Sequence, residues 1–312
     1  MYYIGIDLGG TNIAAGIVEE KGKIICKKSI PTLAYRSTDE IVADMAKLIG
    51  MLIEKGGIST SEIKSIGIGC PGTIDIENGV VIYSNNIPMK HYPMADKLYE
   101  WTGLQVYIDN DANCAALGEY AVYGEGVSSF MLITLGTGVG GGLILNGSIY
   151  HGFNGAAAEP GHMTIVSGGE ECSCGKRGCW EAYASATALI RLTKEAMKKN
   201  PQSLMNKIAA ENDRVTGKTV FDAVLENDGA AKAVLSNYIR YLSDGIVNVE
   251  NMLQPEIIAI GGGVSHAGET LFAPVREYVR KYGFNKYLKK AKIVSAKLGN
   301  DAGIVGAALL NL

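Results

Sequence analysis

Apolar positions along the chain form two patterns, short continuous runs and longer stretches with helical spacing. The runs predict buried strands at residues 2–7, 13–18, 23–30, 65–75, 80–84, 105–109, 256–260 and 292–296. The helical spacing predicts helices at residues 38–55, 94–101, 184–199, 221–225, 229–253, 269–282 and 302–312, and one more that begins near residue 111. Thr38 and Asp39 are suited to cap the first of these helices, and residues 200–220 are polar and irregular. Strands that alternate with helices indicate an α/β fold.

The start of the chain is repeated in residues 130–145. The segments I-D-L-G-G-T-N (6–12) and I-T-L-G-T-G-V (133–139) superpose at an offset of 127 residues. Each is an apolar strand, a Gly/Thr hairpin and a second apolar strand. The backbone of the first hairpin and the hydroxyl of Thr11 are suited to cradle phosphate oxygens, although for this hairpin alone an ordinary glycine turn remains open. The repeat predicts two related α/β domains that each aim a glycine hairpin at one shared cleft.

Length and composition give the same domain number and narrow the class of protein. A chain of 312 residues exceeds the usual size of one core, so we expect a smaller domain at 1–115 and a larger one at 116–299. Residues 300–312 are expected to pack back on the smaller domain. A net charge of −3, with no long basic run and no apolar run of spanning length, predicts neither nucleic acid nor membrane as a partner. The chain start lacks the pattern of a signal peptide, so we expect a cytoplasmic protein with Cys26, Cys70 and Cys114 reduced.

A cysteine cluster lies between Glu159 and Glu181. Its three cysteines read C-x-C-x4-C and follow a histidine. The four residues are Cys172, Cys174, Cys179 and His162. Cys₃His is a common donor set of structural Zn²⁺ sites, so the spacing favours zinc over unpaired cysteines on a flexible loop. Such a loop, bracketed by the two glutamates, would present both carboxylates to a ligand.

Two other places carry candidate chemistry. Asp111 follows a predicted strand and precedes a helix, where α/β sheets place functional groups, although a plain helix N-cap remains the alternative. Residues 261–263 form a third glycine site after a strand. Gly136-x-Gly138-x-x-Gly141 matches the dinucleotide fingerprint only in letters, because a strand follows it. The P-loop-like residues 217–219 lack the leading glycine, because residue 212 is Asn.

Together these motifs resemble the ROK family of sugar kinases and sugar-responsive repressors. They are D-L-G-G-T at 7–11, N-D-A-N at 110–113, L-G-T-G-V-G-G-G at 135–142, E-x-G-H at 159–162 and C-x-C-G-x-x-G-C-x-E at 172–181. The resemblance covers essentially the whole chain, and the cysteine motif is its most specific part. It implies an α/β, two-domain actin-like or hexokinase-like (ribonuclease H-like) fold with a cleft between the domains.

The resemblance also implies a role for each motif residue. Asp111 becomes the general base, and His162 binds zinc with one ring nitrogen and sugar with the other. The implied sugar-binding residues are Gly72, Thr73, Asn86, Asn110, Asp111, Glu159, His162 and Glu181. Those implied to face ATP are Gly9, Gly10, Thr11, Asn12, Thr137, Gly138, Gly262 and Gly263, with Asp7 near Mg²⁺. The zinc ligands are His162, Cys172, Cys174 and Cys179.

The implied activity is that of an ATP-dependent hexokinase, a phosphotransferase acting on the 6-hydroxyl of glucose in glycolysis, and the protein is expected to form a homodimer or a higher homo-oligomer. Phosphorylation of N-acetylmannosamine, N-acetylglucosamine, fructose or allose is the alternative. A sugar-responsive regulator of the same family is expected to carry a helix-turn-helix before the first motif, whose strand here starts at residue 2. A chaperone or filament protein of this fold would not need the zinc loop.

Two departures from the family pattern lie on the sugar side. Pro88-Met89-Lys90 replaces the usual P-G-W, and Ala158 to His162 replace G-E-x-G-H. Both departures bear on which hexose fits.

Overall fold

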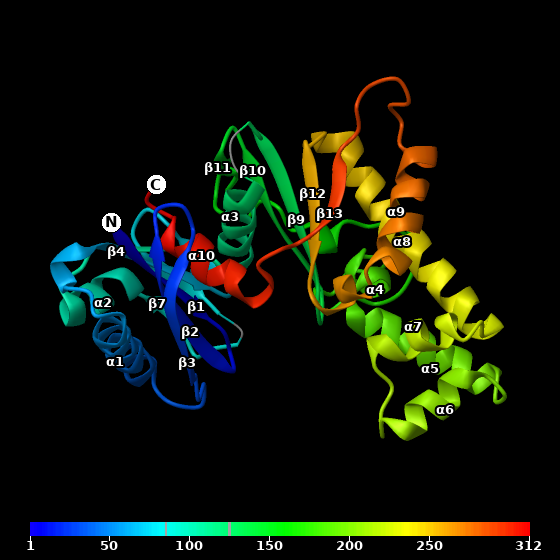
Figure 1. Ribbon diagram of the computed structural model, residues 1–312, viewed down its shortest axis with the longest axis horizontal. Coiled ribbons are helices and arrows are strands. Elements are labelled where there is room, and N and C mark those ends of the chain that lie inside the picture. Colours follow the sequence, from blue (N-terminus) through cyan, green and yellow to red (C-terminus); the bar gives the residue numbers. More distant parts are fainter. Residues whose placement is uncertain (85, 124–125) are drawn as a thin grey trace. The chain divides into compact units, whose positions relative to one another are not determined.

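In the computed structural model, described for residues 1–84, 86–123 and 126–312, the chain forms two compact units (Figure 1). Unit 1 comprises residues 1–130, 142–158 and 297–312. Unit 2 comprises residues 131–141 and 159–296. In the part of the chain described, no helix is both long and apolar enough to cross a membrane.

Unit 1 is built on a five-stranded sheet with the order β3-β2-β1-β4-β8. The strands are β1 (Tyr2–Leu8), β2 (Asn12–Glu19), β3 (Ile24–Pro31), β4 (Ile63–Cys70) and β8 (Val106–Asn110). β1 is antiparallel to β2 and parallel to β4, which is parallel to β8. Asp7 lies opposite Gly69, and Gly69 lies opposite Asp109. The carboxyl ends of three parallel strands, and the acids on two of them, therefore lie at one edge.

The two faces of this sheet are covered by different helices (Figure 1). Ile4 and Ile6 belong to a core that includes residues of α1 (Thr38–Gly56) and α2 (Met94–Thr102). On the other face, a Cβ added to Gly5 would overlap the Ile304 carbonyl of α10 (Ala302–Ala308). Gly67 meets the backbone of the same helix, so glycine in both strands lets the C-terminal helix lie directly on the sheet.

Several shorter elements complete unit 1. A three-stranded sheet has the order β5-β6-β7, with β5 (Thr73–Asp75), β6 (Val80–Tyr83) and β7 (Lys90–Tyr92). Helix α3 (Asp111–Tyr123) packs against α10, which keeps all of it in unit 1. The boundary expected between residues 115 and 116 falls inside this helix, and the division into domains at that point stays a prediction.

A second five-stranded sheet has the order β11-β10-β9-β12-β13. Its strands are β9 (Ser129–Leu135), β10 (Val139–Leu145), β11 (Ser148–Ile149), β12 (Ile257–Gly261) and β13 (Lys292–Ser295). The helices of unit 2 are α4 (Glu181–Ala184), α5 (Ala186–Lys199), α6 (Leu204–Glu211), α7 (Gly217–Leu225), α8 (Gly229–Leu253) and α9 (Glu269–Tyr282). Short 3₁₀ helices include η2 (Pro160–His162) and η3 (Gly263–Ala267).

Most of the predicted elements are confirmed, and α8 and α9 have the predicted limits. Ser37, not Thr38 or Asp39, caps α1, because its side chain accepts from Glu40 N while the Glu40 carboxylate accepts from Ser37 N. The irregular reading of residues 200–220 was wrong, since α6 and the start of α7 lie there. In α6 only Met205 and Ala209 are buried, too few to give a helical period.

Candidate functional site

The first glycine hairpin connects β1 to β2 in unit 1, as predicted. Gly9 N donates to Asn12 O at 2.9 Å, and Thr32 Oγ1 donates to Gly9 O at 2.6 Å. Gly10 faces Asn86, because a Cβ on this glycine would lie 3.1 Å from Asn86 Cβ. Unit 1 therefore brings the first predicted phosphate hairpin against a residue predicted on the sugar side.

Two carboxylates lie at the edge of the unit 1 sheet, and the charge of one acts on the other. Asp7 is on β1, and Asp111 begins α3 directly after β8. Burial, followed by the charge of Asp111, raises the pKa of Asp7 to about 6. Burial also raises the pKa of Asp111, although hydrogen bonds from the backbone N–H groups of Ala112 and Asp111 act in the opposite direction. Two poorly solvated acids in one corner of the sheet suit a divalent cation, whose charge would stabilise both ionised forms.

Asn110 caps α3 and thereby answers the question left open for Asp111. Its Oδ1 accepts from Ala112 N at 2.9 Å and from Asn113 N at 3.3 Å. Asp111 Oδ1 accepts from Ala112 N as well, at 2.9 Å. Because Asn110 supplies the main N-terminal cap of α3, Oδ2 of Asp111 is not needed to cap the helix.

The same asparagine ties α3 to the start of β5. Asn110 Nδ2 donates to Gly72 O at 3.3 Å. Gly72 has a φ of 116°, which side-chain-bearing residues rarely adopt, and it directly precedes Thr73 on β5. Asn110, Gly72 and Thr73, all predicted on the sugar side, are thus brought together in unit 1.

In unit 2 the second glycine hairpin lies against Glu181. Gly136 N donates to Gly138 O at 3.0 Å, and Val139 N donates to Glu181 Oε2 at 3.1 Å. A Cβ on Gly138 would overlap this carboxylate, whereas a Cβ on Gly136 meets open space. Thr137, Gly138 and Glu181 line one cavity of 500 Å³. A predicted sugar-binding acid and a predicted phosphate hairpin are therefore in direct contact.

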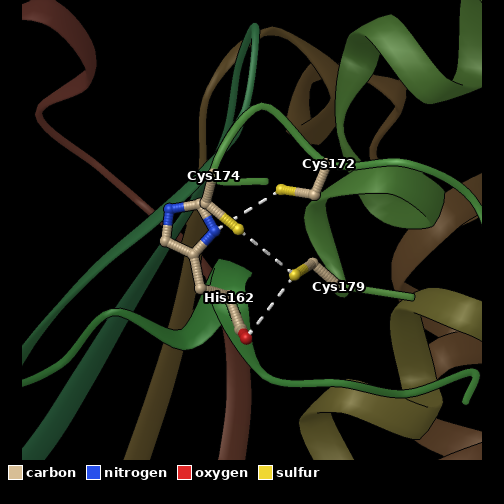
Figure 2. Close-up of side chains that lie close together, drawn as sticks. All are labelled: His162, Cys172, Cys174 and Cys179. Atoms are coloured by element: carbon tan, nitrogen blue, oxygen red, sulfur yellow. Dashed lines mark hydrogen bonds between the residues drawn. The ribbon is translucent and has the colours of Figure 1, made fainter. Parts of the chain in front are cut away.

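The predicted metal ligands converge in unit 2 (Figure 2). His162, Cys172, Cys174 and Cys179 each offer one ligand atom, and these atoms all lie within 4.8 Å of one another. Cys172 Sγ is 3.6 Å from His162 Nδ1, and the Sγ atoms of Cys174 and Cys179 are 3.7 Å apart. A tetrahedron with metal–sulfur bonds of about 2.3 Å and metal–nitrogen bonds of about 2.0 Å has sulfur–nitrogen edges of about 3.5 Å and sulfur–sulfur edges of about 3.8 Å. The cluster therefore has the dimensions of a tetrahedral metal site.

Figure 2 also shows the orientation of the histidine. Nδ1 of His162 lies on the side of the sulfurs, and its other ring nitrogen lies on the far side of the ring. One imidazole nitrogen is thus left for a second partner, which is the geometry expected of a bridging histidine.

The cysteine loop is anchored by its own neighbours in sequence. Trp180, fully buried between Cys179 and Glu181, packs its ring on Gly245 of α8 and donates Nε1–H to Tyr241 O at 2.9 Å. Ser173 Oγ donates to Glu181 Oε1 at 3.3 Å. Trp180 thus anchors the backbone next to Glu181, and Ser173 holds the Glu181 carboxylate.

The E-x-G-H motif is also supported by the strand behind it. Gly161 packs so closely on the backbone of β10 that a Cβ there would overlap the Val139 carbonyl. Glu159 directly precedes η2 and is exposed. Ala158, which stands where the family pattern has glycine, adopts a φ of 62°.

The third glycine site borders a separate cavity of 620 Å³ in unit 2. Gly262 has a φ of 84° and packs on the backbone of Leu135, while Gly263 lines the cavity. Other lining residues, which the sequence reasoning missed, include Arg214, Thr216, Lys218, Phe221 and His266. They come from segments far apart in the chain, and no motif connects them.

The matched structures share the α/β, two-domain actin-like fold that the sequence predicted, and that prediction is confirmed. Residues 3–312 match the ROK family, and the chain belongs to this family. Glucokinase from Halalkalibacterium halodurans is 40% identical over 311 residues, covering 99% of this chain and 94% of that protein. Glucokinase from Thermotoga maritima is 39% identical over 307 residues, covering 98% of this chain and 95% of that protein.

A related structure was determined with bound sugar and nucleotide analogue. The ROK family glucokinase from Streptomyces griseus, crystallised in complex with glucose and AMPPNP, is similar with a TM-score of 0.81 and 34% identity. The alignment covers 99% of this chain and 98% of that one.

Proposed function

We propose that the protein is an ATP-dependent kinase that phosphorylates the 6-hydroxyl of glucose. The observation that carries this proposal is the placement of Asp111, a poorly solvated carboxylate with a raised pKa. Because Asn110 caps the helix, the carboxylate of Asp111 remains available for another role. Identity of 40% to a glucokinase over nearly the whole chain supports the same activity.

Asp111 is the proposed general base. A carboxylate within hydrogen-bond reach takes the proton of the attacking hydroxyl, a contribution of about 10²–10⁴-fold to rate. The raised pKa of Asp111 makes its ionised carboxylate a stronger proton acceptor. The proposed sugar-binding residues are Asn110, Gly72, Thr73 and Asn86 of unit 1, and Glu159, His162 and Glu181 of unit 2.

The glycine hairpins are proposed to hold the nucleotide. ATP, when bound with Mg²⁺, supplies the phosphoryl group, and the cation neutralises charge on the phosphates. Asp7 is the proposed partner of Mg²⁺, which fits its buried position beside Asp111. The hairpin residues are Gly9, Gly10, Thr11, Asn12, Thr137 and Gly138, with Gly262 and Gly263 at the third glycine site. The 620 Å³ cavity beside Gly263, lined by apolar and basic side chains, suits a nucleoside.

The metal of the cysteine cluster is proposed to be Zn²⁺ in a structural role. Three sulfurs and one imidazole nitrogen are the donors that tetrahedral zinc prefers, and their spacing fits. Four protein ligands leave no position for water, so the site is not catalytic. The loop that carries the Cys/His cluster is proposed to hold His162 and Glu181 in fixed orientations.

The preferred hexose is tested by a coupled assay of ADP release over a panel of sugars. The sugar side is rich in acceptors, which suits a neutral polyol, so we expect the highest kcat/KM with glucose. Met89, Lys90 and Ala158 depart from the family pattern on this side, which makes fructose, allose, N-acetylmannosamine and N-acetylglucosamine the competitors to include. A kcat/KM for an acetamido sugar that is at least about tenfold higher than the kcat/KM for glucose would show that glucose is not the preferred substrate. If the protein phosphorylates none of the hexoses in the panel, the proposed kinase function is wrong.

The cellular setting follows as part of the same proposal. We expect a cytoplasmic homodimer or higher homo-oligomer that acts in carbohydrate metabolism, with hexose and ATP as its partners. The acidic net charge of −3 supports the absence of a nucleic-acid partner.

A further inference from the structure

Asp109, the residue two before the proposed base, is a buried carboxylate with several donors. Its side chain is 2% exposed. Oδ1 accepts from Asn110 N at 2.6 Å and from Asn113 Nδ2 at 2.9 Å. Oδ2 lies 2.6 Å from Nε2 of His151. A buried carboxylate is tolerated only when its oxygens are paired, so these donors hold it in one orientation.

His151 supplies the donor from a different part of unit 1. It follows β11, and its side chain is about one-third exposed. An ionised carboxylate only accepts hydrogen bonds, so the imidazole donates its Nε2–H. This hydrogen bond raises the pKa of His151 above its ordinary value of 6.5. None of the sequence motifs contains Asp109 or His151.

The contacts continue from Asp109 to the first turn of α3. Asp109 holds the N–H of Asn110 and the side-chain amide of Asn113. Asn110 in turn accepts from Ala112 N and Asn113 N. Asp111 lies inside this set of hydrogen bonds, so its backbone orientation follows that of its neighbours.

We propose that His151 is a positioning residue for Asp111, acting through Asp109 on the first turn of α3. The proposal rests on the kinase function proposed above. Loss of the His151 donor leaves Oδ2 of Asp109 without this partner and frees the carboxylate to rotate. The N–H of Asn110 and the amide of Asn113 then lose their fixed acceptor, and small displacements of a catalytic group cost rate steeply.

The test compares a variant without a donor and one that keeps it. His151→Leu removes the donor, and a leucine fits because His151 borders a cavity of 330 Å³. His151→Gln keeps an amide N–H that can reach Asp109. Phe153→Leu, fully exposed in the same segment, is the control. We expect His151→Leu to lower kcat by about 10- to 100-fold, the scale set by misplacement of a catalytic group, with the ATP KM within about twofold. His151→Gln and Phe153→Leu should stay within about threefold of wild type by the same reasoning.

Two measurements do not depend on activity. Imidazole NMR, with only four histidines in the chain, should give His151 a pKa above 6.5 that falls toward this value in Asp109→Asn. Amide exchange at Ala112 and Asn113 should accelerate in His151→Leu but not in His151→Gln. If wild type phosphorylates no hexose while both measurements behave as expected, the kinase function fails and the positioning of α3 stands.

Three results would overturn the proposal itself. The first is wild-type kcat in His151→Leu. The second is equal loss of kcat in the Leu and Gln variants in step with loss of thermal stability, because that marks a purely structural role. The third is a His151 pKa at or below 6.5 in an active enzyme.

Discussion

Acidic side chains are held in different ways in the two units. In unit 1, Asp7 and Asp111 lie at the ends of β1 and β8, and the parallel register with β4 brings these ends to one edge. In unit 2, Glu159 and Glu181 bracket residues 160–180, which are described throughout. The regular secondary structure of residues 160–180 consists of η2 and two isolated β-bridges. Order in this segment comes from the Cys/His cluster, from Trp180 packed on Gly245 and from backbone hydrogen bonds such as Ile165 N to Gly178 O.

This difference predicts different sensitivities to mutation. A sheet edge is held by many backbone hydrogen bonds, so removal of one side chain there should change chemistry and leave position intact. The loop of unit 2 has backbone hydrogen bonds of its own, such as Ile165 N to Gly178 O, but its four candidate ligands would share one metal. Loss of one ligand should therefore move the groups that the loop carries.

Asp111→Asn should have the largest effect, at unit 1. The substitution keeps the size of the side chain and removes the proton acceptor, so kcat should fall by at least about 10²-fold while glucose affinity is largely kept. Steady-state kinetics and calorimetric glucose binding measure the two quantities. Asp96→Asn, on the exposed surface of α2, is the control. Retention of more than about a tenth of wild-type kcat would mean that another residue is the base.

The pH profile gives the same assignment a second check. The base acts in its ionised form, and burial raises the pKa of Asp111 above 3.8. Activity should therefore be present at neutral pH and be lost as pH falls through this raised pKa. An acid limb at 3.8 or below would contradict the raised pKa.

Cys179→Ser should have the next largest effect, at unit 2. Loss of one thiolate should lower zinc from near one per chain and raise the glucose KM by about 10- to 100-fold, the usual cost of a damaged metal environment. The ATP KM should change less, and the protein should stay folded because most of its core lies elsewhere. Elemental analysis, circular dichroism and kinetics measure these outcomes.

Cys26→Ser is the matched control, because this half-buried thiol of unit 1 is outside the cluster. Freshly purified wild-type protein without zinc would sink the metal assignment. A zinc-free Cys179→Ser variant with wild-type glucose KM would show that glucose binding does not depend on the metal.

Two glycines of the β9–β10 hairpin sharpen the comparison further. A side chain at Gly138 would overlap Glu181, so Gly138→Ala should raise the KM of both glucose and ATP, by about tenfold for a displaced contact. Gly136 has open space, and Gly136→Ala should affect ATP alone. Equal glucose KM values in the two variants would mean that Glu181 does not bind the sugar.

The sequence predicted the regular elements of both units more fully than their irregular segments, for a physical reason. Strands such as 2–7 and helices such as 269–282 repeat apolar positions at fixed periods, and their limits follow from that. The four residues of the Cys/His cluster were also predicted to lie together, because cysteine spacing is itself a signal. By contrast, the contact of Gly138 with Glu181, which joins residues 43 positions apart, has no periodic signature.

The same reason explains the residues that were missed. Asp109 was hidden beside the N-D-A-N motif, and His151 is a single histidine in a segment without regular pattern. The lining of the 620 Å³ cavity joins α5, α7 and η3, which meet only in the folded chain. The one available signal was the unusual pair Asp109 and Asp111 at a strand end.

The smallest predicted effect concerns Ala158, the last residue of unit 1 before Glu159. Its φ of 62° is left-handed, a conformation that costs a residue with a Cβ about 1–2 kcal/mol. Glycine removes this cost but adds about 0.4–1 kcal/mol of chain entropy to the unfolded state. Ala158→Gly should therefore stabilise the protein slightly, raising Tm by about 1–3 °C for a chain of this size. Ala156→Gly, two residues earlier and without a positive φ, should lower Tm instead. Thermal unfolding of both variants decides the matter, and equal losses of Tm would show that residue 158 is not strained.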